Sequence, residues 1–202
     1  MEQYGKILRD GGVLLHPTET VYGLAARWDN FDALKKVAHL KQRDVNKPLS
    51  IMISSYQSLE TDLLITDSWI LDICKKLLPG ALTLLIPSKQ NYPLAYWNQF
   101  PEIGIRYPNH ELSNFLINSC GVPIITTSAN LTGEPPPIAF EKVNSSIRAG
   151  VDEKLDYGTC RHSIPSTIIK VDPTDKSCII VRQGAYPTEL LSSILTIRKK
   201  PI

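Results

Sequence analysis

Residues 17–23, Pro-Thr-Glu-Thr-Val-Tyr-Gly, constrain the fold of this chain more than any other stretch. They follow the apolar run at residues 13–15, which predicts a buried strand. Pro17 has no backbone N–H to donate to a sheet, so we expect the strand to end there. Hydroxyls, a carboxylate and a phenol then stand at the strand's end, where open α/β sheets bind ligands. The alternative is a turn that bonds only to its own backbone and to water, and the pattern leaves both open.

The composition indicates a folded globular chain. Its 202 residues are 43% hydrophobic and 21% charged, enough for a substantial core. The net charge of +2 is too small to mark the whole chain as a nucleic-acid binder. The four cysteines are widely spread without a C-x-x-C pair, which argues against a zinc site and favours a reducing compartment. No signal peptide or membrane-length apolar run is present, so we expect a cytoplasmic protein with no membrane partner.

Apolar periodicity predicts alternating helices and strands. Strands are expected at residues 13–15, 49–53, 82–86, 103–107, 122–127, 168–171 and 178–181. Helices are expected at residues 2–9, from Asp29 or Asn30 to Gln42, after Asp67 or Ser68, after Asn109, around residues 140–147 and at residues 188–197. Residues 90–101 are expected to form a loop, and the basic residues 198–200 a solvated tail.

Three cations crowd the connection between the second helix and the strand after it. Lys41, Arg43 and Lys47 fall within seven residues. Lys41 extends the buried stripe of the helix, so its ammonium either reaches out to solvent or points at an anion. A lysine in the last turn also suits the negative end of the helix dipole. The alternative for the whole group is a solvated charged face.

Further polar groups lie within or at the ends of apolar strands. Arg106 alternates with isoleucines, and is therefore either an edge residue or a buried anion clamp. Ser128 and Asn130 follow one strand, Ser166 precedes another and Arg182 ends the last. No glycine-rich phosphate loop, H-E-x-x-H motif or nucleophile elbow is present. The residues themselves therefore predict a pocket for a polyanion and a small polar molecule.

Several of these motifs together resemble the YrdC/TsaC family. The matching motifs are residues 17–23, Lys41-x-Arg43, Pro79-Gly80-x-x-Thr83 and Thr126-x-Ser128-x-Asn130. They occur in the family's order, and the resemblance covers residues 11–184. It implies an α/β fold in which a twisted, open, mixed sheet with flanking helices surrounds a large basic cavity. Residues 1–202 would form one such catalytic domain, without the additional C-terminal domain of longer members.

The resemblance also implies an activity. Family members are nucleotidyltransferases that make threonylcarbamoyl-AMP from L-threonine, bicarbonate and ATP and release pyrophosphate. The product would pass to a downstream tRNA threonylcarbamoyl transferase, for the N6-threonylcarbamoyl modification of adenosine 37 in tRNAs reading ANN codons. Mg²⁺ is expected to enter with ATP, because the chain shows no cluster of carboxylates that would hold it alone.

The resemblance assigns residue roles. It gives a catalytic role to Lys41 and Arg43, which would stabilise charge on the phosphates. It places ATP beside Lys41, Arg43, Lys47, Ser128, Asn130, Pro136 and Arg182. It places threonine beside Thr20, Arg106, Thr126 and Ser166.

One position departs from the family pattern. Met52 stands where longer members have a histidine, so the contact with threonine at that point is open. We interpret Met52 as a candidate wall around the methyl group of threonine.

Two other classes of function compete with this interpretation. A basic cavity would also attract an RNA backbone, which leaves open a weak contact with RNA, but few aromatic residues accompany the cations. The related domain of hydrogenase-maturation proteins uses carbamoyl phosphate. It would bring acylphosphatase and zinc-finger-like segments, which this sequence does not show.

Overall fold

The computed structural model describes residues 2–198, which fold into one mixed sheet with helices packed against it. The strands are β1 (Leu14–His16), β2 (Gly23–Arg27), β3 (Ser50–Met52), β4 (Leu82–Pro87), β5 (Glu102–Arg106), β6 (Ile124–Ser128), β7 (Glu153–Lys154), β8 (Thr167–Asp172), β9 (Ser177–Arg182) and β10 (Thr196–Arg198). The helices are α1 (Glu2–Arg9), α2 (Phe31–Leu40), α3 (Gln57–Thr61), α4 (Ser68–Leu77), α5 (Glu111–Cys120), α6 (Ser145–Gly150) and α7 (Thr188–Ser192), with 3-10 helices η1 (Ala95–Gln99) and η2 (Phe140–Lys142).

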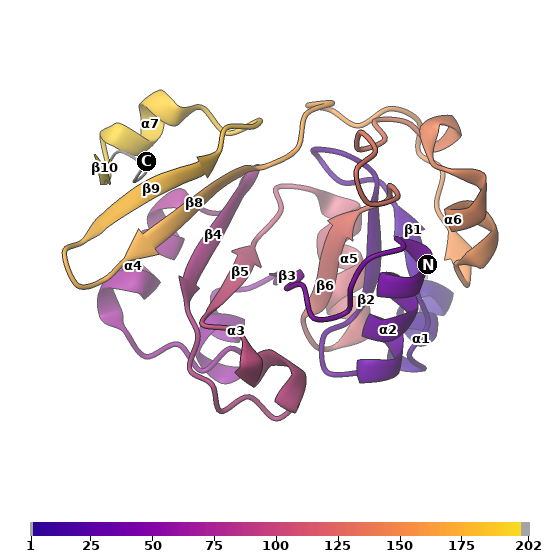
Figure 1. Cartoon of the computed structure of the whole chain (residues 1–202), viewed down its shortest axis with the longest axis horizontal. Coiled ribbons are helices and arrows are strands. Elements are labelled where there is room, and N and C mark those ends of the chain that lie inside the picture. The colour runs from indigo at the N-terminus through magenta and orange to yellow at the C-terminus, as the bar shows by residue number, and fades with distance from the viewer. Residues whose placement is uncertain (1, 199–202) are drawn as a thin grey trace.

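The strand order is β10-β9-β8-β4-β5-β3-β6-β2-β1-β7. Strands β8, β9 and β10 therefore lie at one end of the sheet and β1, β2 and β7 at the other, with β5 and β3 between them (Figure 1). The segment after β7 runs from one end of the sheet to β8 near the other. Segments that are distant in sequence consequently meet over the middle of the sheet.

The pairing registers divide the side chains between two faces. Register partners share a face, and side chains along a strand alternate between faces. One face carries Ser50, Met52, Arg106, Thr126 and Ser128. We call this the site face. The opposite face carries Leu24, Ile51, Ile105 and Ile125 and contributes to the larger core cluster.

Two hydrophobic clusters hold the helices on the sheet. The larger cluster joins the opposite face to α2, α3 and α4. The smaller one lies on the site face beneath α1 and α5 and contains Leu14, Met52 and Ile124. Helices α1 and α5 also contact each other, since the backbone of Ser119 leaves no room for a side chain at Gly5. These two helices thus cover part of the site face.

The helix starts follow capping chemistry. Asn30 caps α2 by accepting from the Ala33 N–H at 3.1 Å, and Asp67 caps α4 through the Ile70 N–H at 3.0 Å. The expected cap at Asn109 is wrong by one residue. His110 caps α5 instead, because its Nδ1 accepts from the Ser113 N–H at 3.3 Å.

The structure corrects two further expectations. The expected loop at residues 90–101 contains η1, which buries Trp97 completely. The expected helix at residues 188–197 is instead the short α7 followed by β10, which pairs with β9. Arg198, the first residue of the expected solvated tail, is exposed as predicted and forms ion pairs with Asp172 and Asp175, while residues 199–200 lie outside the described residues. Within residues 2–198, no helix is both long and apolar enough to cross a membrane.

Candidate active site

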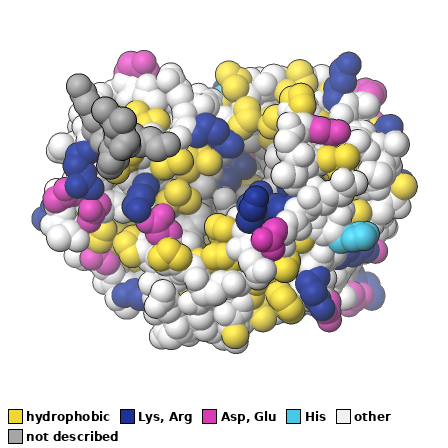
Figure 2. Space-filling model, viewed as in Figure 1, with side chains coloured by type: hydrophobic (Ala, Val, Ile, Leu, Met, Phe, Trp, Pro, Cys, Tyr) yellow, Lys and Arg dark blue, Asp and Glu magenta, His cyan; other side chains and the backbone are white. Residues whose placement is uncertain are grey.

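A cavity of about 240 Å³ opens on the site face where β3, β4, β5, β6, β8 and β9 approach one another. In the space-filling view, dark-blue Lys and Arg side chains gather around a hollow near the centre of the molecule (Figure 2). The residues that line the cavity are Thr20, Val21, Arg43, Pro48, Leu49, Ser50, Thr83, Arg106, Thr126, Thr127, Ser128, Pro136, Pro165, Ser166, Ile168 and Arg182. They include three arginines, many hydroxyls and no carboxylate, so the cavity suits an anion.

The loop between β1 and β2 places Thr20 in this cavity. Thr18 Oγ1 accepts from the Thr20 and Val21 N–H groups at 3.1 and 3.2 Å and donates to the Val21 carbonyl at 2.8 Å. Thr18 therefore builds the turn, and Thr20, whose hydroxyl lies 2.8 Å from that of Thr18, lines the cavity. Thr18 thus behaves as the turn alternative predicts, whereas the hydroxyl of Thr20 faces the cavity and contacts Arg106.

Arg106 is a buried clamp and not an edge residue. Its Nη2 donates to Glu19 Oε1 at 2.9 Å and to Thr20 Oγ1 at 3.3 Å. The side chains of Arg106 and Glu19 are 8% and 2% exposed, so solvent screens this ion pair little. The pair fixes the guanidinium at the wall of the cavity.

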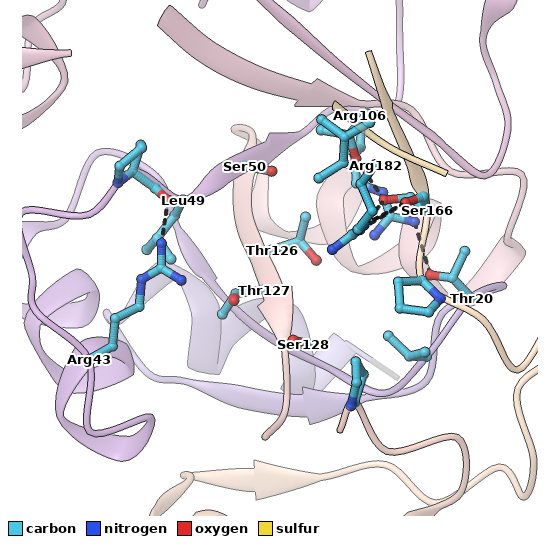
Figure 3. A pocket seen from close by; sticks show the side chains of 16 residues that line it. Thr20, Arg43, Leu49, Ser50, Arg106, Thr126, Thr127, Ser128, Ser166 and Arg182 are labelled. Carbon is cyan, nitrogen blue, oxygen red and sulfur yellow. Dashed lines mark hydrogen bonds between the residues drawn. The ribbon is translucent and has the colours of Figure 1, made fainter. Parts of the chain in front are cut away.

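Arg182 and Ser166 lie beside Arg106 (Figure 3). Arg182 Nη2 donates to the Ser166 carbonyl at 2.8 Å, and Ser166 Oγ lies 2.8 Å from Thr83 Oγ1. Burial and the nearby charge of Arg106 lower the pKa of the Arg182 guanidinium. Two neighbouring guanidinium groups repel each other, and an anion between them relieves that repulsion.

Arg43 lies across the cavity from Arg106, Arg182, Ser166 and Thr20 (Figure 3). Its Nη2 donates to the Pro48 carbonyl at 3.0 Å, and Thr126, Thr127 and Ser128 of β6 lie between the two sides. The cavity therefore has two cationic ends separated by hydroxyls. Such an arrangement suits a ligand, or a pair of ligands, with anionic groups at both ends.

Lys41 lies behind the cavity and does not line it. It is 3% exposed, and its ammonium donates to the Ser128 carbonyl, to the Asn130 carbonyl at 2.8 Å and to Asn130 Oδ1 at 3.4 Å. Burial, with a smaller effect of Arg43, lowers the pKa of Lys41 to about 8. Lys41 thus fixes the turn after β6, a role that differs from both alternatives of solvent exposure and direct contact with a ligand.

The residues expected from sequence divide into two groups. All four expected at the threonine site line the cavity, namely Thr20, Arg106, Thr126 and Ser166. Of those expected at the ATP site, Arg43, Ser128, Pro136 and Arg182 line it, whereas Lys41, Lys47 and Asn130 do not. Lys47 is exposed, and Asn130 Nδ2 donates to the Leu131 and Glu134 carbonyls at 2.9 and 2.7 Å.

The interpretation of Met52 as a wall of this cavity is wrong. Met52 shares the site face with Arg106, but it is fully buried in the smaller cluster under α1 and α5 and does not line the cavity. Ser50, two residues earlier on the same face, does line it. No contact with a ligand was expected for Ser50, Thr83 or Thr127, although Thr83 belongs to one of the family motifs. The alternation of Leu49, Ile51 and Ile53 was the signal for Ser50, because it places Ser50 on the other face of the strand.

The described residues 2–198 include no group of three or more His, Cys, Asp or Glu side chains that could hold a metal ion. All four cysteines are free and buried. Burial raises the pKa of the Cys160 thiol, and the nearby His162 donates its backbone N–H to the Glu19 carbonyl. The backbone of His162 thus joins the segment before β8 to the loop that carries Glu19.

Comparisons with known proteins find one family model, related sequences and solved structures of similar fold. The Sua5/YciO/YrdC family model, described as "Telomere recombination", matches residues 6–184. A relative from Methanocaldococcus jannaschii is 33% identical over 192 residues, covering 95% of this chain and 89% of the relative. A threonylcarbamoyl-AMP synthase from Vibrio campbellii is 34% identical, covering 91% and 98%. The crystal structure of Pyrococcus abyssi Sua5 complexed with L-threonine matches with a TM-score of 0.86 and 28% identity, covering 98% of this chain but 58% of that one.

Proposed function

The chain belongs to the Sua5/YciO/YrdC family, and on that premise we propose that it is a threonylcarbamoyl-AMP synthase. It joins L-threonine, bicarbonate and ATP into threonylcarbamoyl-AMP and releases pyrophosphate. Sequence relatives carry this name, and a structure of similar fold binds L-threonine.

One observation supports the proposal most strongly: the convergence of Thr20, Arg106, Thr126 and Ser166 on one cavity. They come from four segments that are distant in sequence. Arg106 offers a guanidinium to a carboxylate, and the three hydroxyls offer polar partners to an amine and an alcohol. This combination matches the functional groups of free threonine.

The opposite end of the cavity suits the nucleotide. Arg43 lies at that end and is the cation placed to meet phosphate oxygens, and Ser128 lies between the two ends. Pro136 also lines the cavity. We propose that Lys41 contributes by holding Ser128 and Asn130 in position, and that Lys47 and Asn130 act at the rim of the nucleotide site. Arg182 lies beside Ser166, so we place it where the two substrates meet.

The chemistry then needs positioning and charge stabilisation more than a nucleophilic side chain. The amine of threonine forms a carbamate with bicarbonate, and a carbamate oxygen displaces pyrophosphate from the α-phosphate of ATP. Negative charge grows on the phosphate oxygens during that displacement. Guanidinium groups fixed before reaction stabilise this charge without reorganising.

We propose that Mg²⁺ enters bound to ATP. The lining of the cavity includes no carboxylate, which suits a cation held chiefly by phosphate oxygens. Mg²⁺ would neutralise phosphate charge there. We also propose that the product passes to a tRNA threonylcarbamoyl transferase for modification of adenosine 37.

Pyrophosphate release from the purified protein tests the proposal. Full release should require ATP, L-threonine and bicarbonate together, with each omitted in turn from otherwise identical reactions. Mass spectrometry should then detect threonylcarbamoyl-AMP. Release at the same rate without threonine would overturn the proposed function. Arg106→Met should raise the KM for threonine by at least about tenfold, because a charged hydrogen bond is worth roughly 1.5–3 kcal/mol.

A further inference from the structure

A second cavity, of about 780 Å³, lies behind Arg106 at the start of α5. Glu19, His110 and Arg161 are among the residues that line it, together with Leu112 and Phe115. Glu19 belongs to this second cavity, whereas its neighbours Thr20 and Arg106 line the first. The Glu19–Arg106 ion pair therefore forms the partition between the two cavities.

The two carboxylate oxygens of Glu19 have different surroundings. Oε1 accepts from Arg106 Nη2 at 2.9 Å. Oε2 is buried and has no hydrogen-bond partner among the described residues. A buried carboxylate oxygen without a donor is costly unless a ligand or water supplies one. The proposed reaction supplies a donor, because free threonine arrives with an ammonium group.

We propose that Glu19 is the general base that takes a proton from the ammonium of threonine and releases it to water in the second cavity. This inference rests on the proposed function. An α-amino acid carries its carboxylate and its ammonium on one carbon atom. If Arg106 holds the carboxylate, the ammonium comes within reach of the carboxylate that Arg106 already contacts.

The proton balance of the reaction requires such an acceptor. The ammonium gives one proton to the Glu19 carboxylate, which leaves a neutral amine and a carboxylic acid. The nitrogen lone pair then forms the N–C bond with bicarbonate, and one water molecule leaves as the carbamate forms. Glu19 returns to the carboxylate by giving its proton to water on the side away from the nucleotide, so the phosphates are not protonated.

The charged and titratable groups around Glu19 come from β1, β5, α5 and the segment before β8. They are His16, Arg106, His110, Glu111, Tyr157, Cys160 and Arg161. Burial lowers the pKa of both histidines, that of His16 to about 3, and raises the pKa of the Cys160 thiol. The two histidines therefore stay neutral between about pH 7 and pH 9, and the raised pKa keeps the Cys160 thiol protonated over most of that range. A pH trend in that range would report the amine of threonine.

The test compares Glu19→Gln with the wild-type protein across this pH range. Glutamine keeps an acceptor for Arg106 but cannot take the proton. At pH 7, kcat/KM for threonine should fall about 100-fold or more. As the pH rises, the ratio of wild-type to Glu19→Gln kcat/KM should shrink by up to about tenfold per pH unit. The reason is that the fraction of threonine with an uncharged amine, which needs no base, grows by that factor. Glu111→Gln, which removes an exposed carboxylate of the same cavity, should behave like the wild type at every pH.

A deficit that stays constant with pH would overturn the inference, because Glu19 would then only orient Arg106. If Glu19→Gln does not fold, the pH dependence of kcat/KM in Glu19→Asp tests the same proposal. Aspartate retains a base, so the loss of kcat/KM relative to the wild type, whatever its size, should stay constant as the pH rises. A loss that shrinks as threonine deprotonates would contradict the proposal. Threonine-independent pyrophosphate release by the wild-type protein would instead overturn the proposed function, and this inference with it.

Discussion

At the scale of single residues, Lys41 shows how one side chain can serve the cavity without lining it. Its ammonium meets backbone oxygens of Ser128 and Asn130, so the turn after β6 depends on it. The sequence placed Lys41 on the buried stripe of its helix, and its burial confirms this. The helix wheel could not identify the partners, because they lie at the end of β6 and in the turn after it, almost ninety residues later.

Lys41→Ala should lower both stability and activity. Three oxygens lose their donor, which costs roughly 1–3 kcal/mol of unfolding free energy, and the loosened turn misplaces Ser128. Urea unfolding and pyrophosphate release measure the two effects. Lys47→Ala is the matched control, since Lys47 is exposed, and its stability should change by less than about 0.5 kcal/mol. Unchanged stability in Lys41→Ala would show that the turn does not depend on the ammonium.

His16 links the stability of the fold to pH. It is fully buried, and neither ring nitrogen has a hydrogen-bond partner among the described residues. Burial, with smaller effects of His110 and Arg106, lowers its pKa from 6.5 to about 3. Between these values the unfolded chain binds a proton that the folded chain does not. Stability should therefore fall as the pH drops from 6.5 toward 3.

The expected slope from His16 is about 1.4 kcal/mol per pH unit. In His16→Leu this contribution disappears, so the loss of unfolding free energy between about pH 6.5 and 4.5 should be roughly 2–3 kcal/mol smaller than in the wild type. Urea unfolding at several pH values measures it. His39→Gln replaces an exposed histidine and should keep the wild-type slope. Equal slopes in His16→Leu and the wild type would show that His16 is charged inside the fold.

At the scale of elements, apolar runs predicted most strands but missed β2, β7 and β10, and the physical cause is clear for β2 and β10. β2 reads Gly-Leu-Ala-Ala-Arg, whose glycine and alanines have low strand preference, and it forms because β1 and β6 pair with it on both sides. β10 falls inside an expected helix because pairing with β9 overrides the local helical pattern. Both strands are fixed by neighbours that a local window of sequence does not contain.

The turn after β9 packs directly on the segment that carries Ser166. A Cβ atom at Gly184 would lie 2.2 Å from the Pro165 carbonyl oxygen and 2.5 Å from the Ser166 carbonyl carbon. Gly184→Ala should therefore push Ser166 out of place, lower stability by about 1–3 kcal/mol and raise the KM for threonine.

Gly80→Ala is the control for this change. Its added methyl group would meet Tyr186 at 3.4 Å, an ordinary contact, so it should leave the KM for threonine unchanged. Thermal unfolding and steady-state kinetics measure both variants. If Gly184→Ala kept the wild-type KM for threonine, Ser166 would not contact that substrate.

At the scale of the whole molecule, the meeting of distant residues was the part that residue patterns could not supply. Periodicity placed Thr20, Arg106, Thr126 and Ser166 near strands, but not beside one another. Their meeting depends on the strand order, in which β8 pairs with β4 and β3 lies between β5 and β6. The family resemblance gave this arrangement, since it draws on folds already known. The resemblance did not predict that Lys41 lies behind the cavity, nor that Glu19 lines the second cavity while Thr20 lines the first.

The same strand order has a consequence for synthesis on the ribosome. β4 is complete at residue 87, but its partner β8 begins only at residue 167. Until β8 emerges, one side of β4 has unpaired N–H and C=O groups along the uncharged sequence Leu-Thr-Leu-Leu-Ile-Pro. At about 5–20 residues per second, this interval lasts on the order of 4–16 s. A fragment of residues 1–165 should therefore self-associate through this edge, whereas the full chain should not.

Sedimentation velocity of the fragment and of the full chain measures this difference. Leu85→Lys places a charge on the open edge of β4 and should reduce association of the fragment. A fragment that stayed monomeric at micromolar concentration would show that another segment covers β4 during synthesis. If the fragment does self-associate, a nascent chain is vulnerable to aggregation until β8 has left the ribosome and paired with β4.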